Sequence, residues 1–368
     1  MNAHIINVSD ENLFLQTYLP NGYLGVGLVL SSFTPQALSN ACKTSYSMYA
    51  DMKTIREGDL IFVHAGQRIY GAYKAESEFM EDPATNGLFH SLNLHYHPQP
   101  NNPQSGWQNN NLALQQNAGN VADYRQLSIS HFTEAGTNLC FPWGIDSREV
   151  FDIRQKRRIY FVPEKWEYPD SRRTIRPLLT FEAWEIVKLL ERQNSDELTR
   201  TTIAPKNLNG FLGIDFILNP NIVEDEKIIE GYICGNFGRN QNVDSSFGVF
   251  GSFGNNMPVP GGYTKMMDIF GLQEFSHNSK KFKIVEVKKG ACVFPDHISQ
   301  LIGYMDLITE NIARGELKNV EGILVAKEFD ADVTSFVSIF NQLGRMIKLI
   351  QFDYVPPQFR SLNFTRVI

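Results

Sequence analysis

Short apolar runs, separated by glycines and turn residues, dominate the first ninety residues of the chain. Residues 23–30 (YLGVGLVL), 59–64 (DLIFVH) and 68–76 (RIYGAYKAE) have the composition of β-strands, and a helical pattern at 35–49 lies between the first two. Strands with a helix among them predict a small mixed α+β barrel in this half of the chain.

The pattern between residues 141 and 193 has two parts. Residues 141–162 return to strand-like patterning. Residues 181–193 (FEAWEIVKLLERQ) instead repeat apolar side chains at helical spacing, so that one face carries Phe181, Trp184, Val187 and Leu190. We expect this amphipathic helix to close the first domain.

Strands and helices alternate in the last third of the chain. A helix is predicted over 222–234, because acidic residues occupy its first turn, where the helix dipole favours negative charge. After a Gly-, Ser- and Asn-rich segment, the pattern predicts strands at 266–270, 283–287, 320–326 and 347–352, and helices at 297–313 and 333–345. Such alternation is typical of an α/β sheet with parallel strand pairs.

A polar, aperiodic stretch at 194–209, which contains Pro205, is the predicted linker, so we expect domains at 1–205 and 206–368. Residues 93–120 are rich in Asn and Gln and carry no charged side chain, which predicts a long insertion, because they can bury too little apolar surface to offset their ordering entropy. The insertion contains His95 and His97, but two histidines without a third ligand are a weak metal signal.

The net charge, the apolar segments and the cysteines of the chain exclude several classes of protein. The formal charge of −6 argues against a general attraction to nucleic acid, so such contacts must come from local basic patches. The chain shows no signal peptide and no apolar window long enough to span a membrane, which predicts a cytoplasmic protein without a membrane partner. Widely spaced cysteines indicate reduced thiols rather than a disulfide framework or a zinc site; they are Cys42, Cys140, Cys234 and Cys292.

Two common catalytic motifs are absent from the sequence. The segment GSFGNNMPVPGGYTK lacks the G-x4-G-K-[ST] spacing of a phosphate loop, so no nucleotide cofactor is expected. No G-x-S-x-G motif occurs, so the sequence offers no such nucleophilic serine for hydrolysis.

The most informative chemical pattern joins two carboxylates and a lysine on neighbouring strands. Asp268 ends one apolar strand, and Glu286 and Lys288 stand two apart in the next. Side chains two apart share a face of a strand, so Glu286 and Lys288 point the same way while Val287 points into the core. The carboxylates can hold Mg²⁺, with the Val287 carbonyl as a further oxygen ligand. The lysine can orient or deprotonate the attacking water, or stabilise charge on a phosphate.

Residues 222–354 resemble the PD-(D/E)XK nuclease superfamily, and within it the carboxy-terminal domain of NucS-type and related RecB-like nucleases. The resemblance rests on Asp268, on the triplet EVK at 286–288 and on QLIGY at 300–304. It implies that the two carboxylates bind the metal and that the lysine serves catalysis.

The same resemblance adds candidate residues on two helices. Gln300 and Tyr304, four apart on one helix face, are expected to lie beside the metal or a phosphate. Glu230 matches the acidic residue that the family tends to place on its first helix, whereas Met267 departs from the proline usual before the aspartate. Asp296 is interpreted as the N-cap of the following helix rather than as a ligand.

Residues 55–79 (IREGDLIFVHAGQRIYGAYKAESEF) resemble the PUA-like superfamily, particularly EVE-type and YTH-related domains, with FPW at 141–143 as a second block. The resemblance implies a pocket that receives a flipped, often modified, base between aromatic side chains. The candidate aromatic residues, for each of which core packing is the alternative, are Tyr70, Tyr73, Trp107 and Trp143.

Basic segments supply candidate contacts to nucleic acid. Residues 154–176 combine basic and aromatic side chains, which suits a phosphate backbone with unstacked bases beside it; the candidates are Arg157, Arg158, Arg172 and Arg173. A solvated surface that is basic by chance is the alternative. A second patch, expected to adjoin the proposed active site, consists of Lys280, Lys281, Lys283, Lys288 and Lys289.

The sequence thus predicts an α/β protein with a C-terminal restriction-endonuclease-like mixed sheet flanked by helices, preceded by an N-terminal PUA-like α+β barrel domain. The expected function is Mg²⁺-dependent hydrolysis of DNA phosphodiesters, with Mn²⁺ as a substitute ion, by a restriction-type defence endonuclease, either modification-dependent or of another restriction type. The alternatives are a repair nuclease for mismatched or branched DNA and a non-catalytic nucleic-acid-binding module. Double-strand cleavage needs two active sites, which predicts a homodimer.

Overall fold

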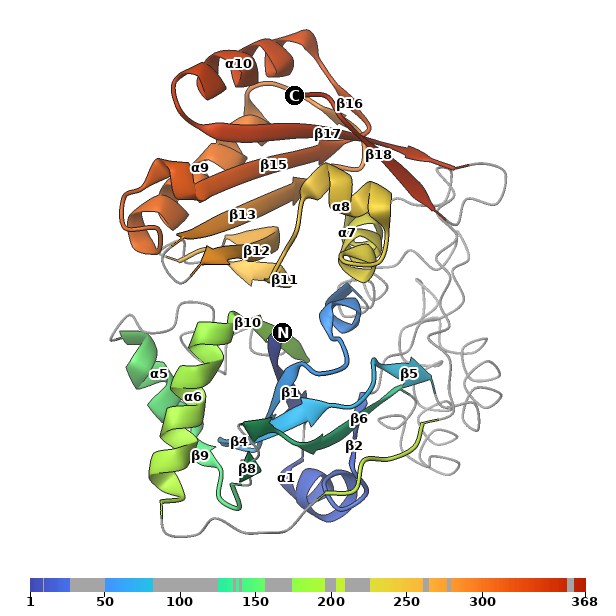
Figure 1. Ribbon diagram of the computed structural model, residues 1–368, viewed down its shortest axis with the longest axis vertical. Helices are drawn as coiled ribbons and strands as arrows, with labels where there is room; N and C mark the ends of the chain where they lie inside the picture. The colour runs from blue at the N-terminus through green and yellow to red at the C-terminus, as the bar shows by residue number, and fades with distance from the viewer. Residues whose placement is uncertain are drawn as a thin grey trace, which may run out of the picture.

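The computed structural model describes two sheets and the helices around them, drawn one above the other in Figure 1. The residues described are 1–8, 10–26, 50–81, 125–134, 137–138, 141–155, 174–195, 203–208, 226–260, 265–276, 279–355 and 361–368. The predicted helix at 35–49 and the Asn- and Gln-rich insertion lie outside them. No helix among the described residues is long and apolar enough to cross a membrane.

The first sheet contains eight of the described strands, with the main order β10-β1-β3-β4-β6-β2. Its central strands are buried at nearly every position, because both faces of the sheet are covered. β1 and β3 are parallel, whereas the other neighbours in this order are antiparallel. The strands are β1 (Ala3–Val8), β2 (Tyr23–Val26), β3 (Leu60–Ala65), β4 (Arg68–Ala75), β5 (Met80–Glu81), β6 (Arg125–His131), β9 (Ile145–Asp146) and β10 (Ile175–Leu178).

One face of this sheet packs against α6 (Thr180–Gln193), which confirms the predicted amphipathic helix. The strand-like pattern predicted over 141–162 is wrong for its described middle part, since α5 (Ser147–Gln155) is a helix. Val150 and Ile153, three apart, enter the same core as α6, so the apolar spacing serves a helix face. A short helical segment, α1 (Glu11–Leu13) and η1 (Phe14–Tyr18), covers part of the other face.

The second sheet contains six described strands in the order β11-β12-β13-β15-β17-β18. β13, β15 and β17 are mutually parallel, which confirms the alternating pattern, and the other pairs are antiparallel. The strands are β11 (Ser252–Pro258), β12 (Met266–Ser276), β13 (Ser279–Val287), β15 (Val320–Ala326), β17 (Met346–Tyr354) and β18 (Leu362–Arg366). The outer strands β11 and β18 were not expected from the sequence. Two small pairs, β7 (Thr133–Glu134) with β8 (Thr137–Asn138) and β14 (Ala291–Cys292) with β16 (Glu328–Phe329), complete the described strands.

Helices cover the two faces of this sheet. On β15, Ile323 and Val325 belong to the core that contains α7 (Glu226–Asn236) and α8 (Gln241–Phe247), whereas Leu324 belongs to the core that contains α9 (Asp296–Asn311) and α10 (Ala331–Gln342). This alternation follows from the two-residue period of a strand. A short turn, η5 (Leu317–Asn319), precedes β15.

Asp296 is not the N-cap of α9. It is the first helical residue, and Pro295 stands at the cap without a side-chain hydrogen bond. Asp296 therefore contributes a negative charge to the first turn, which the helix dipole favours, rather than a capping acceptor.

The two sheets are joined by buried contacts. One hydrophobic cluster contains residues of both, from Ile6 and Val63 to Val285 and Ile350. Arg56 donates to the carbonyls of Cys234 and Phe237 at 2.8 and 3.2 Å, at the carboxy-terminal end of α7. The two sheets therefore share one of the hydrophobic clusters of the molecule, and the boundary near residue 205 stays a prediction. Cys234 and Cys292 are free and buried, as predicted for reduced thiols.

Candidate active site

Asp268 and Glu286 come together because β12 and β13 form an antiparallel hairpin. Ile269 pairs with Val285, which brings the preceding and following carboxylates to the same end of the two strands. The Asp268 carboxylate accepts a hydrogen bond of 2.8 Å from the Val287 N–H, so it is fixed against the backbone of β13. The two carboxylates are therefore neighbours, as predicted, but Asp268 stands near the start of β12 rather than at the end of a strand.

Glu286 has unequal surroundings at its two carboxylate oxygens. Oε1 accepts from Lys288 Nζ at 2.7 Å and from Gln300 Nε2 at 2.6 Å, whereas Oε2 is buried without a hydrogen-bond partner. Glu286 and Lys288 share a strand face as expected, and Val287 is buried. Glu286 is itself only 1% exposed, so the strand face that carries it is covered at this carboxylate.

Helix α9 covers Glu286. Gln300 uses its amide nitrogen for both Glu286 and the Tyr304 hydroxyl, 2.8 Å away. The helical spacing of four residues therefore places both predicted side chains at the site, but Tyr304 reaches Glu286 through Gln300. Tyr304 is 4% exposed and belongs to the core beneath α9.

Helix α7 brings in Glu230, as predicted, and one residue that the sequence analysis missed. Lys227 Nζ lies 2.8 Å from Glu230 Oε2 and 3.3 Å from Asp268 Oδ1. Glu230 is fully buried, and its Oε1 has no hydrogen-bond partner. Lys227 stands three residues before Glu230, so helical spacing was the signal that could have identified it.

Burial and neighbouring charges shift the pKa values of the carboxyl and amine groups in this cluster. Burial, and then the negative charge of Asp268, raise the pKa of Glu286 to about 8. The same two causes raise the pKa of Glu230 well above its ordinary value. Burial lowers the pKa of Lys227 and Lys288, but the adjacent carboxylates outweigh this effect and raise both above the ordinary lysine value. Both lysines are therefore ammonium ions at neutral pH.

The donor set fits a hard divalent cation at Asp268 and Glu286. Glu286 Oε2 is an unsatisfied oxygen donor, and repulsion between two carboxylates is what a bound cation relieves. Among the residues that the structure describes, no three His, Cys, Asp or Glu side chains are grouped closely enough to hold a metal ion. Glu230 contacts Lys227 in the structure, and both Glu230 and the Val287 carbonyl stay predicted ligands.

Two of the aromatic candidates for a base pocket, Tyr70 and Tyr73, are buried in the core. Tyr70 donates a hydrogen bond to Glu11, and its ring, like that of Tyr73, packs against Phe14 in the core. Tyr70 and Tyr73 are 5% and 2% exposed, whereas Trp143 is 52% exposed. Trp107 lies outside the described residues.

The lysine patch predicted beside the active site is wrong for its first three members. Lys280 pairs with Glu274 and Lys281 with Glu321, toward the opposite end of β13 from Lys288. Lys283 is buried and donates to the carbonyls of Phe247 and Val249. Lys289 is exposed next to Lys288, and its contact with nucleic acid stays a prediction.

Arg157, Arg158, Arg172 and Arg173 lie outside the described residues. Arg176, the last basic residue of the same run, is 5% exposed within β10 and so does not offer its charge to a ligand.

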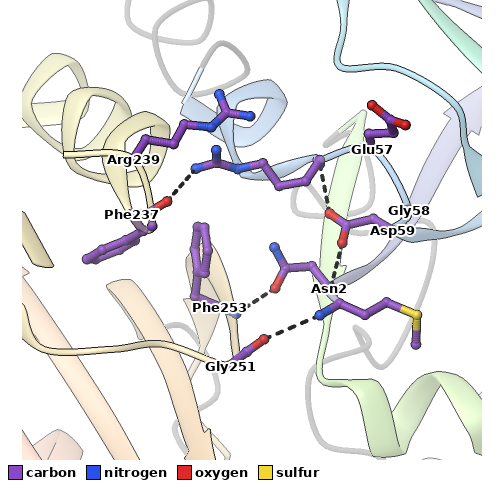
Figure 2. A pocket seen from close by; sticks show the side chains of 11 residues that line it. Asn2, Glu57, Gly58, Asp59, Phe237, Arg239, Gly251 and Phe253 are labelled. Atoms are coloured by element: carbon purple, nitrogen blue, oxygen red, sulfur yellow. Dashed lines mark hydrogen bonds between the residues drawn. The ribbon is translucent and has the colours of Figure 1, made fainter.

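A separate cavity of about 520 Å³ lies where the two sheets meet. Figure 2 shows its walls, with Asn2 and Asp59 from the first sheet region facing Phe237 and Phe253 from the second. Asn2 accepts a hydrogen bond from the Phe253 N–H at 2.9 Å, and its own N–H donates to Asp59 at 2.6 Å. None of Tyr70, Tyr73 and Trp143 lines this cavity.

No protein-family model matches the chain, and no curated protein matches it. The solved structures that match include the crystal structure of a repair endonuclease from Pyrococcus abyssi, with 21% identity and a TM-score of 0.19, over 26% of this chain and 36% of that one. They also include human THYN1 protein in complex with 5-methylcytosine-containing DNA, with 14% identity and a TM-score of 0.26, over 52% of this chain and 98% of that one. The chain thus spans about a third of the length of the endonuclease.

Proposed function

We propose that this chain is a metal-dependent endonuclease that hydrolyses phosphodiester bonds in DNA. The observation that carries the proposal is the convergence of Asp268, Glu286 and Lys288, in which one buried oxygen of Glu286 has no protein donor. A buried carboxyl group that faces a second negative charge costs folding free energy, so its presence beside a lysine favours a role in binding a cation and a charged substrate.

The side chains of the site have separate roles in the proposed hydrolysis. Asp268 and Glu286 would hold the metal ion, and the chemistry that Mg²⁺ supplies when bound is Lewis-acid stabilisation of charge on the phosphate. Lys288 is an ammonium ion held by Glu286, which suits stabilisation of the developing negative charge and orientation of water better than removal of a proton. Gln300 positions Glu286 by donating to Oε1, which leaves Oε2 for the cation.

The test uses the full-length protein and a supercoiled plasmid in Mg²⁺, with EDTA as the metal-free control. Glu286→Gln keeps the side-chain shape but removes the charge, and Lys288→Met removes the ammonium. We expect either change to lower the cleavage rate by about a hundredfold or more, because each removes a few kcal/mol of charge stabilisation. Binding of the plasmid should persist in both variants.

The same two strands offer matched controls. Glu274 and Lys280 form an ion pair at the other end of β12 and β13, where Glu274 is exposed and Lys280 half-buried. Glu274→Gln and Lys280→Met should therefore leave cleavage unchanged. Plasmid binding by the wild-type protein without any metal-dependent cleavage would contradict the proposal and favour the non-catalytic module.

We propose further that the enzyme is of restriction type and that residues before about 205 discriminate between modified and unmodified DNA. The resemblance of residues 55–79 to PUA-like domains supports this assignment. Digestion of matched modified and unmodified plasmids should show a preference for one of them. Equal cleavage of both, together with preferential cutting of mismatched or branched duplexes, would instead support the repair alternative.

A further inference from the structure

Lys227 occupies a place next to Asp268 that a cation would favour. It stands in the first turn of α7, and its Nζ lies between Glu230 Oε2 and Asp268 Oδ1 at 2.8 and 3.3 Å. Its side chain is 22% exposed, whereas that of Glu230 is fully buried. Lys227 is therefore the more exposed partner of a buried carboxylate.

Lys288 and Lys227 contact different carboxylates of the site. Lys288 contacts Glu286, from two residues along the same strand, and Lys227 contacts Asp268 from a different element. Lys288 belongs to the proposed catalytic triplet, but nothing in that chemistry requires Lys227. Its contacts are instead those of a counter-ion for Asp268 and Glu230.

We infer that Lys227 is a resident counter-cation, which holds Asp268 and Glu230 in place without metal and must move away from Asp268 when a divalent cation binds. The inference rests on the proposed function, because it takes Asp268 as a metal ligand. Positive charge at Asp268 Oδ1 opposes a second cation at the same carboxylate. Apparent metal affinity is therefore reduced by the fraction of molecules in which Lys227 contacts Asp268.

The experiment measures metal binding directly, without DNA and without cleavage. Ca²⁺ and Mn²⁺ are titrated calorimetrically into full-length wild-type protein and into Lys227→Met. Because the competing charge is gone, Lys227→Met should bind either ion at least about fivefold more tightly, the lower end of typical coupling between two ligands. In EDTA it should melt at a lower temperature than wild type, and Ca²⁺ should restore more of its stability.

Two further variants separate charge from packing. Lys227→Gln can still donate to Glu230 without a charge, so it should also bind the ions more tightly, and it serves if Lys227→Met does not fold. Lys280→Met removes a lysine that contacts Glu274 at the far end of β13, so its metal affinity should equal that of wild type.

The outcomes distinguish the inference from the proposed function. Unchanged or weaker binding in both Lys227 variants, with normal binding by wild type, overturns the role of Lys227 alone. Absence of binding by wild type and by both variants overturns the metal site as well. Metal binding that is detected only in the Lys227 variants supports the inference most strongly, because Lys227 would then prevent binding in the wild type.

Discussion

Burial gives individual ionisable residues of this protein properties that they do not have in water. Glu286 is buried with donors on one oxygen only, and Asp268 adds a negative charge nearby, so its pKa rises to about 8. His64 shows the converse case in the first sheet. Burial, followed by the positive charge of Arg176, lowers the pKa of His64 to about 4.

His64 should make the protein sensitive to acid. Since the folded state resists the proton that the unfolded chain takes up below about pH 6.5, stability should fall as the pH falls from about 6.5 to about 4, by about 3 kcal/mol at most. His64→Gln removes the titrating group and can retain a hydrogen bond to Asn7, which accepts from His64 at 3.0 Å. Denaturant unfolding at several pH values should give a flatter profile for the variant. Parallel profiles for the two proteins would show that another group dominates.

At the level of elements, the site depends on how closely α9 approaches β15. Gly322 in β15 lies beneath α9, and a Cβ built there would be 2.5 Å from Met305 Sδ and 3.2 Å from Leu301 Cδ2. The absence of a side chain at this position therefore lets α9 carry Gln300 to within hydrogen-bonding distance of Glu286.

Gly322→Val should displace α9 from the sheet. Overpacking of this kind costs about 1–3 kcal/mol, and we expect cleavage to fall further than stability explains, because Gln300 would withdraw from Glu286. Thermal melting and plasmid cleavage at a temperature where both proteins are folded measure the two effects.

Gly303 offers a control on the same helix, since a Cβ there meets no atom within 4 Å. Gly303→Ala should stabilise the protein by about 0.5–1 kcal/mol through helix propensity. A Gly322→Val protein with wild-type stability and activity would show that α9 tolerates displacement.

At the scale of the whole molecule, α7 links the candidate active site to the first sheet. Its first turn carries Lys227, and the carbonyls at its other end accept hydrogen bonds from Arg56. The shared hydrophobic cluster continues this connection, so the two sheets are expected to unfold together rather than independently.

The proposed binding of DNA depends on the charge of the whole molecule, because a net charge of −6 confines attractive contacts to local basic segments. Replacing Arg157, Arg158, Arg172 and Arg173 with Ala should weaken binding to all sequences without changing which substrate is preferred. For each phosphate that the variant no longer neutralises, the slope of log affinity against log salt should decrease by about 0.9 for duplex DNA or about 0.7 for single strands. Fluorescence anisotropy at several salt concentrations measures both effects.

Exposed cations outside this run provide the comparison. Arg148 and Lys318 have side chains that are 83% and 79% exposed, and their replacement with Ala should change the slope little. An unchanged slope in the quadruple variant would identify residues 154–176 as a solvated surface and place the DNA path elsewhere.

The sequence by itself determined the features that depend on local spacing. The alternation of strands and helices after residue 266, the helix at 180–193 and the common face of Glu286 and Lys288 all follow from periods of two or 3.6 residues. Gln300 and Tyr304 meet for the same reason, since four residues make about one helical turn. These features depend only on residues that are close together in the sequence.

Only the tertiary structure decided which distant groups meet and which are buried. The contact of Asp268 with the Val287 N–H spans 19 residues and depends on hairpin register, and the contact of Lys227 with Asp268 spans 41 residues and depends on how α7 packs. Burial likewise placed Tyr73 and Arg176 among the interior residues, although their types also suit a binding surface. Exposure and long-range contacts arise from packing between elements. The spacing of residues within one element carries no information about that packing.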